Sequence, residues 1–356
     1  MLNELIEARK FADSVKYSGD TLVANQSIKV NTDEIDTYFS LNSMLVTPDV
    51  TPIISDSVER VIKRLKIPSS AVKAYVYASP EIQAECYAGS DTDCVIRLSS
   101  GLIDILENEE IEFVIGHELG HFLYDHGLAV QSNTNESIEF LIQKRAQEVS
   151  ADRIGLLASE SLDVSIRAMM KTMSGLTSKY LNFDIAAFIS QLSNSSNFKS
   201  QISISSSHPS MLIRCRALLW FSMSETFSLG KKNYQPREIH KLNQKIQSDI
   251  DKYVDSVARD RIQDLKRDVA IWTSAMLIVE DGSFDTDEQE IFKGMFGQKT
   301  LENLKAFLSG HNSKKSVQES VFRKLEDARK QLYFAIPTSF ENELETLESK
   351  IKLNYK

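Results

Sequence analysis

Two histidines and a glutamate have the spacing of a metal-binding and proton-transferring site in the pattern H-E-x-x-H at residues 117–121. Successive residues of a helix turn by about 100°, so His117 and His121 share one face and their imidazoles can bind a single Zn²⁺. Glu118 is better placed to reach a water on the metal than the metal itself, which is the position of a general base. With His126, three of the chain's six histidines lie within ten residues. This clustering argues against the alternative that the histidines lie on a buried helix by chance.

A catalytic zinc ion needs a third protein ligand and an open position for water. Glu148 provides this ligand in a segment, residues 137–157, whose apolar spacing predicts a helix. Asp152 follows one turn later on the same face and can accept the ring N–H of a ligand histidine, which fixes its tautomer. Taken alone, Glu148 would be interpreted as a solvated glutamate, but its place downstream of the histidine pair favours a ligand.

The helix that carries the histidines is expected over residues 108–126, with Asn108 as its cap and Gly127 beyond its end. Gly116 and Gly120 are poor helix formers, and each costs up to about 1 kcal/mol relative to alanine. A pair of glycines one turn apart therefore predicts that another backbone passes close to this helix.

With these motifs the chain resembles the HtpX-type and CAAX-prenyl-protease-type zinc metallopeptidases, which are gluzincins. The resemblance covers roughly residues 70–225 and rests on Ser99–Leu106, H-E-x-x-H, Glu148-x-x-Ala151-Asp152 and His208-Pro209-x-x-x-x-Arg214. It implies a mostly helical α+β fold with a small edge-strand sheet and one zinc ion per chain, bound by His117, His121 and Glu148. The implied activity is hydrolysis of peptide bonds in a polypeptide substrate by a zinc-activated water, with Glu118 as general base.

His208 is expected in the active-site cleft, within reach of the metal or its water. There it would either occupy the open metal position or donate a hydrogen bond to the oxyanion. The alternative is a loop histidine held beside Pro209 after the Ser/Asn-rich segment 193–207. Arg214 is expected to anchor this element through a carboxylate, with Asp152 as one candidate partner.

Short strands are expected at residues 74–77 and 95–98, and the second lies where gluzincins keep the edge strand that pairs with substrate. The family usually has an Asn-Ala pair before this strand, whereas residues 83–89 contain no asparagine, so substrate handling is expected to differ. Further helices are expected at residues 1–20, 32–45, 55–65, 162–175, 184–192 and 211–224.

Composition limits the class of protein. The chain has 356 residues, 42% of them hydrophobic and 26% charged, as in globular proteins. Neither a signal sequence nor a run of 18 apolar residues is recognised, so no membrane insertion is expected.

The net charge of −9 is concentrated in residues 1–230, which contain 19 Lys and Arg and 29 Asp and Glu. This acidic balance argues against nucleic acid as a partner. Three cysteines without metal-type spacing predict free thiols and a cytoplasmic location.

A linker is expected at residues 229–236, between a metallopeptidase domain (1–229) and an all-helical domain (237–356). An EF-hand calcium-binding loop that starts at Asp281 would need Gly at its sixth position and Glu at its twelfth. These positions hold Thr286 and Phe292, so this motif is excluded. The region resembles TerB-like helical modules only at Asp281-Gly282 and Glu288, and a capped helix–turn–helix is the alternative.

The C-terminal domain is expected to be an interaction or regulatory domain that binds a protein partner. The alternative function for the whole chain is a catalytically silent, zinc-stabilised scaffold that acts through these helices. An intact Glu118 argues against the scaffold, because a structural zinc site has no use for a base.

Overall fold

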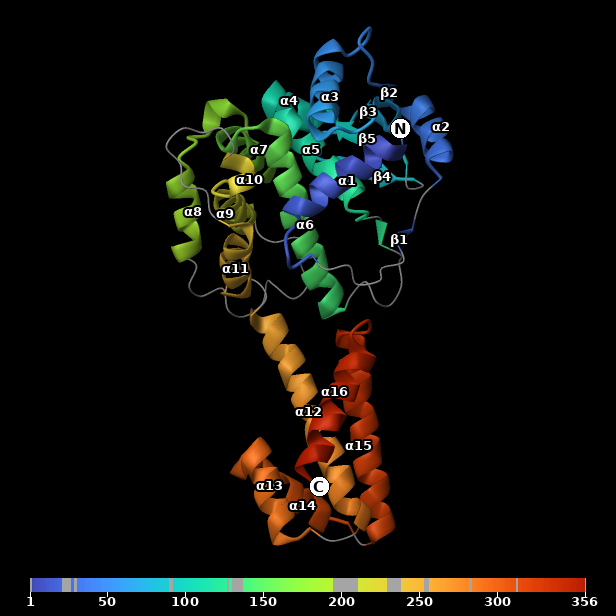
Figure 1. Cartoon of the computed structure of the whole chain (residues 1–356), viewed down its shortest axis with the longest axis vertical. Coiled ribbons are helices and arrows are strands. Elements are labelled where there is room, and N and C mark those ends of the chain that lie inside the picture. The colour runs from blue at the N-terminus through green and yellow to red at the C-terminus, as the bar shows by residue number, and fades with distance from the viewer. Residues whose placement is uncertain are drawn as a thin grey trace. The chain divides into compact units, whose positions relative to one another are not determined.

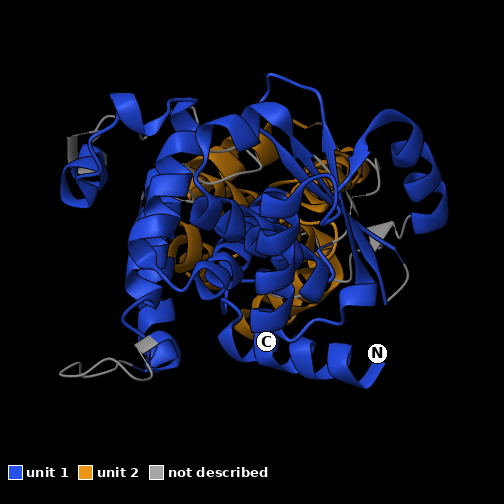
Figure 2. Cartoon of the chain, turned by 90° about the horizontal axis from the view of Figure 1, so that it is seen from above, with its two compact units in different colours: residues 1–132, 141–255 blue, residues 133–140, 256–356 orange. Residues whose placement is uncertain are grey.

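The computed structural model describes residues 2–20, 27–28, 31–89, 92–126, 128–129, 137–194, 211–228, 238–252, 256–281, 284–311 and 313–355. Its elements are labelled in Figure 1. The chain divides into two compact units (Figure 2): residues 1–132 with 141–255, and residues 133–140 with 256–356. This boundary lies beyond the linker expected at residues 229–236.

The first unit consists of helices around a small sheet. Its helices are α1 (Leu2–Val15), α2 (Thr32–Asn42), α3 (Pro52–Leu65), α4 (Ser100–Ile105), α5 (Asn108–Leu123), most of α6 (Ile138–Ser159), α7 (Leu162–Ser174), α8 (Ile185–Asn194), α9 (Met211–Phe221), α10 (Glu225–Ser228) and α11 (Ile239–Ile250). Two 3-10 turns, Ser69–Ala71 and Ser178–Tyr180, join them.

Four strands form the main sheet in the order β2-β3-β5-β4. They are β2 (Met44–Leu45), β3 (Val72–Tyr77), β4 (Ala84–Ala88) and β5 (Cys94–Ser99). β3 and β5 are parallel, whereas β2 and β4 run antiparallel to their neighbours. A separate antiparallel pair joins β1 (Ser27–Ile28) to β6 (Leu128–Ala129). A strand is present at residues 95–98, but the expectation that it forms the edge of the sheet is wrong. β5 is an inner strand, and β4 forms the edge.

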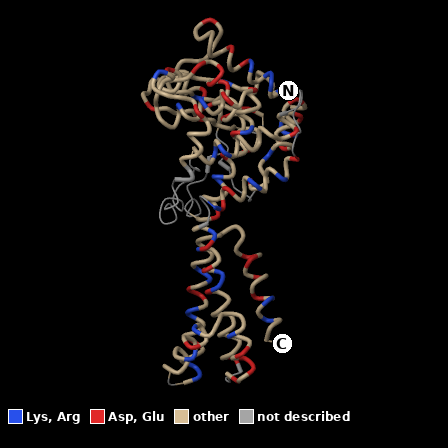
Figure 3. The backbone as a smooth tube through the Cα atoms, turned by 90° about the vertical axis from the view of Figure 1, so that its left-hand side faces the viewer, with Lys and Arg blue, Asp and Glu red and all other residues tan. Residues whose placement is uncertain are grey.

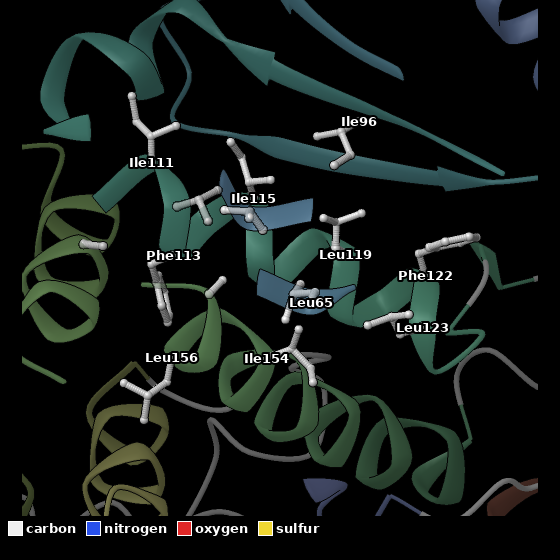
Figure 4. Close-up of a cluster of buried hydrophobic side chains, with 14 of the residues drawn as sticks. Leu65, Ile96, Ile111, Phe113, Ile115, Leu119, Phe122, Leu123, Ile154 and Leu156 are labelled. Carbon is white, nitrogen blue, oxygen red and sulfur yellow. The ribbon is translucent and has the colours of Figure 1, made fainter. Parts of the chain in front are cut away.

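Helix α5 lies inside the first unit. Figure 4 shows its Ile115 and Leu119 between Ile96 of β5 and Ile154 of α6. These side chains are fully buried, and α5 has buried residues on every side, as expected for a helix enclosed by other elements. The histidine motif is thus carried by a helix that other elements enclose, and their packing holds its side chains in fixed directions.

The N-terminus of α5 differs from the expectation. Glu107, not Asn108, is the cap, and its backbone N–H donates to the carboxylate of Glu110 at 2.8 Å. The Nζ of Lys171 on α7 donates to the same carboxylate at 2.6 Å, and both side chains are buried. Glu110 therefore serves both as a capping residue and as half of a buried ion pair that joins α5 to α7.

All described elements of the second unit from residue 256 onward are helices. Its helices are α12 (Ser256–Asp281), α13 (Thr286–Phe296), α14 (Gln298–Ser309), α15 (Lys314–Ala335) and α16 (Phe340–Asn354). Asp285 caps α13 and forms a capping box with Glu288, which is the capped turn considered as an alternative. Basic and acidic residues are interspersed along these helices (Figure 3). None of the described helices in either unit combines the length and apolar character that a membrane span requires.

Candidate metal centre

The helices α5 and α6 cross in close contact at glycines. A methyl group on Gly116 would overlap the Cβ of Ala158, and one on Gly120 would lie 3.0 Å from the Cα of Ala151. The prediction that another backbone passes close to this glycine pair is confirmed. Because the two backbones approach so closely, side chains on the facing turns of both helices can converge on one point.

Three side chains converge beside this crossing. The Nε2 atoms of His117 and His121 lie 3.2 Å apart. The carboxylate of Glu148 lies 3.6 Å from His117 Nε2 and 3.5 Å from His121 Nε2. Two ligands at about 2.1 Å from a tetrahedral zinc ion are about 3.4 Å apart, so the observed separations fit a zinc ion bound between them. In the described part of the chain, these three residues form the group able to hold a metal.

The orientation of His117 depends on Asp152. The Asp152 Oδ1 lies 3.0 Å from His117 Nδ1, and a carboxylate can only accept, so Nδ1 carries the proton. The lone pair of the ring is then on Nε2, which faces His121 and Glu148. The pKa of the His117 ring is raised, although burial lowers it, because Asp152 and Glu148 lie close. The two carboxylates therefore make this ring a stronger base, and a more basic imidazole is a better metal ligand.

Arg214 on α9 joins two carboxylates of α6. Its Nε and Nη2 atoms donate to Asp152 at 2.8 and 2.6 Å, and its Nη1 lies 2.9 Å from Glu148 Oε2. Burial raises the pKa of Asp152, but the charge and hydrogen bonds of Arg214 outweigh this and lower it to about 2. Asp152 is therefore charged at neutral pH, held in place by a bidentate pair.

Glu118 has the electrostatic character of a proton acceptor. Its carboxyl pKa is raised to about 7, first by burial, while the nearby His117 lowers it and Glu148 raises it. A carboxyl with a pKa near neutrality can both take up and release a proton at neutral pH. Edge strand β4 lies near it, because Cys86 and Glu85 of that strand interact electrostatically with Glu118.

The structure brings together six of the seven site residues expected from the sequence. His117, Glu118, His121, Glu148, Asp152 and Arg214 all belong to one cluster on α5, α6 and α9. The seventh, His208, lies outside the described residues.

Sequence reasoning missed two neighbours of the site. His126 Nδ1 lies 3.0 Å from His121 Nδ1, and His126 Nε2 lies 2.9 Å from Asp20 Oδ2. His126 had a signal in the histidine cluster, whereas Asp20 is 106 residues away in sequence and had none.

Strand β4 was also missed. Its Ala84, Cys86 and Ala88 pack against the main core, whereas Tyr87 packs against the separate cluster of Phe39, Tyr75 and Val95. Alternate residues thus face opposite sides of the sheet, as in a strand.

Comparison with known proteins identifies a family for part of the chain. Residues 48–142 match Peptidase family M48. The plastoglobule-localized metallopeptidase 48 of Arabidopsis thaliana is 28% identical over 135 residues, which are 33% of this chain and 39% of that protein. The HtpX homologue of Streptococcus uberis is 32% identical over 76 residues (21% and 25%), and the Escherichia coli metalloprotease YcaL is 41% identical over 63 residues (18% and 23%).

The chain spans less than half the length of each of these relatives. No solved structure matches it significantly. The family match ends before Glu148 and Arg214, yet the fold brings both residues to the matched histidines. The resemblance to HtpX-type metallopeptidases is thus supported by the match of residues 48–142 to Peptidase family M48 and by an HtpX homologue and a metalloprotease among the relatives.

Proposed function

We propose that the chain is a zinc-dependent metalloendopeptidase of the gluzincin type, with His117, His121 and Glu148 as zinc ligands. The observation that carries this proposal is the convergence of two Nε2 atoms and one carboxylate at separations of 3.2, 3.5 and 3.6 Å. Glu118 lies on the same helix between the two histidines and has a carboxyl pKa of about 7. Three ligands and an adjacent base are the composition of a catalytic zinc site, whereas a structural site closes with four ligands.

Each residue of the cluster has a role in this mechanism. When bound, zinc supplies the positive charge that acidifies a water molecule and polarises a peptide carbonyl. Glu118 takes the proton of the attacking water and delivers it to the leaving amine. Asp152 holds the His117 ring, and Arg214 holds Asp152 and Glu148. His208 is proposed to enter the cleft and either occlude it or stabilise the oxyanion.

The proposed substrate is a polypeptide bound in extended form along β4. This strand is at the edge of the main sheet, and among the described residues no strand pairs with its outer side. Strand addition at a sheet edge recognises the backbone of a peptide largely independently of its sequence. The electrostatic interaction of Cys86 with Glu118 supports a peptide path that passes the proposed base.

The second unit is proposed to be an interaction or regulatory domain that binds a protein partner. Three aromatic side chains of α15, Phe322, Tyr333 and Phe334, are about half exposed, and aromatic residues are enriched at protein interfaces. A resemblance to TerB-like modules would support the same role.

A cytoplasmic location is proposed from the thiols. Cys86, Cys94 and Cys215 are all free, and free thiols are maintained in a reducing compartment.

The proposal is tested with the purified full chain, an unfolded protein such as casein, and metal analysis. Wild type should contain one zinc per chain, lose activity with a chelator and regain it when zinc is added. Glu118→Gln should keep the zinc and lose activity by about 10²–10⁴-fold, since only the base is removed. His117→Ala should lose the metal.

Glu109→Gln is the matched control, because this glutamate is exposed in the first turn of the same helix. It should retain both zinc and activity. A Glu118→Gln protein that cleaves as fast as wild type would contradict the mechanism. Zinc binding without cleavage of any polypeptide by wild type would favour the scaffold instead.

A further inference from the structure

We infer that His126 and Asp20 are positioning residues that fix the ring of His121 so that its Nε2 atom faces the metal. This inference rests on the proposed function, since it concerns the second histidine of the proposed zinc site. Asp20 lies in the turn after α1, outside the residues that match the M48 family. Through His126 it is connected to the proposed ligand His121 on α5.

The carboxylate of Asp20 determines which ring nitrogens of His126 and His121 carry a proton. Asp20 Oδ2 lies 2.9 Å from His126 Nε2 and can only accept, so His126 carries its proton on Nε2. In the neutral ring the Nδ1 atom is then an acceptor. His121 Nδ1 lies 3.0 Å from it and must donate, which leaves the lone pair of His121 on Nε2. This is the atom that faces His117 and Glu148.

The environment keeps this arrangement in one state. The side chains of His126 and Asp20 are buried, so water cannot replace either partner. The ring of Tyr124 stacks on His126 with centroids 5.2 Å apart, and the backbone N–H of His126 donates to the carbonyl of His121 at 2.9 Å.

His126 is not placed as a fourth ligand. It contacts the Nδ1 atom of His121, on the side of the ring opposite to the Nε2 atom that faces the other two ligands. The two ligand histidines are thus oriented differently: His117 by a carboxylate directly, and His121 by a neutral imidazole that a carboxylate orients in turn. Such contacts behind metal ligands typically change metal affinity by about 10–100-fold when removed.

The test is zinc affinity, measured by competition with a chelator on the full chain. Three variants separate the two contacts of His126. Asparagine places a carbonyl oxygen near the Nδ1 position and can still accept from His121, but it does not reach Asp20. Glutamine places an amide nitrogen near the Nε2 position and can still donate to Asp20, but it offers His121 no acceptor. Alanine removes both contacts.

His126→Ala and His126→Gln should lower zinc affinity by about 10–100-fold, and His126→Asn should stay close to wild type. The visible absorption of the cobalt-substituted protein, which reports ligand geometry, should change in the same two variants. Tyr124→Phe is the control, because it removes the hydroxyl that donates to Ala12 O at 2.7 Å and keeps the ring beside His126. It should lower the stability of the zinc-free protein without changing zinc affinity.

Two results would overturn the inference. In one, all three His126 variants bind zinc as wild type does. In the other, glutamine preserves affinity and asparagine does not, which would mean that His126 only holds Asp20 in the fold. Both leave the proposed function intact, whereas a wild-type protein that binds no zinc would refute that function itself. Unfolding of the zinc-free variants, followed by circular dichroism, shows whether each variant is folded.

Discussion

Gly120 of α5 lies so close to Ala151 of α6 that a Cβ atom at position 120 would be only 3.0 Å from the Cα of Ala151. Few real Cβ atoms have a neighbour this near, so the separation of the two helices depends on the absence of a side chain. The same crossing brings Glu148 to the histidines. The geometry of the candidate zinc site is therefore set partly by a residue that has no functional group.

Gly116→Ala should separate the helices. The new methyl group would overlap the Cβ of Ala158, and overpacking of this kind typically costs about 1–3 kcal/mol, against a gain in helix propensity of up to about 1 kcal/mol. We expect a lower free energy of unfolding and weaker zinc binding, measured by urea denaturation and chelator competition. Gly294→Ala in α13 is the control, because nothing lies within 4 Å of its new methyl group. It should stabilise the protein, and equal effects of the two substitutions would contradict the packing argument.

Asp152→Asn should weaken zinc binding by about 10–100-fold, because the substitution removes the charged acceptor of the His117 ring. It also removes one of the negative charges that neutralise the buried Arg214. Breaking a buried ion pair typically lowers the free energy of unfolding by about 3–5 kcal/mol. Asp249→Asn is the control, since Asp249 accepts from Arg216 of the same helix α9 at 2.6 Å. The control should reduce stability only, as measured by urea denaturation beside zinc titration. Equal zinc affinity in both variants would exclude an orienting role for Asp152.

Tyr75 should make stability depend on alkaline pH. Burial, and then its 2.6 Å hydrogen bond to Asp36, raise its pKa from 10.0 to about 12. The folded state therefore holds this proton more tightly, so its stabilising contribution is complete below pH 10 and is lost as pH rises towards 12. Tyr75→Phe should be less stable than wild type at pH 8, and the difference should shrink by pH 11. Tyr38→Phe, at an exposed position of α2, should follow the wild-type curve. A constant difference between wild type and Tyr75→Phe would contradict this assignment.

A fragment of residues 1–255 should fold and bind zinc, whereas a fragment of residues 1–229 should be less stable. Helix α11 buries Leu242, Ile246 and Ile250 in the first unit, and burial of each such side chain contributes about 1.5–3 kcal/mol. Its Asn243 also accepts from Arg153 of α6 at 2.6 Å. Thermal unfolding of the two fragments, with and without zinc, tests this boundary. Equal midpoints would show that α11 is not part of the unit.

The local parts of the site could be predicted from the sequence. His117, His121 and Glu118 lie within one helical turn, and the periodic apolar residues around them identify the helix. Glu148 and Asp152 are likewise one turn apart, so their shared face follows from helix geometry alone. The close approach at Gly116 and Gly120 was also predictable, because glycines are costly in helices without a packing reason.

Features that depend on tertiary contacts could not be predicted in this way. The inner position of β5 is a matter of strand order, which is set by the pairing of β4 and β3 with it and not by its own residues. Asp20 has no local pattern that connects it to His126, 106 residues later. The membership of α11 in the first unit depends on which apolar surface it contacts, and an amphipathic sequence does not specify that surface.

The pairing of Arg214 with Asp152 has a consequence for protein synthesis. The two residues are 62 positions apart, so at about 5–20 residues per second a ribosome needs about 3–12 seconds to make Arg214 after Asp152. During this interval the nascent chain already contains His117, His121 and the carboxylates of Glu148 and Asp152. It does not yet contain the guanidinium that holds these carboxylates in place. The complete candidate centre can form only after this interval, so a metal ion can enter the finished site only late in the life of the nascent chain.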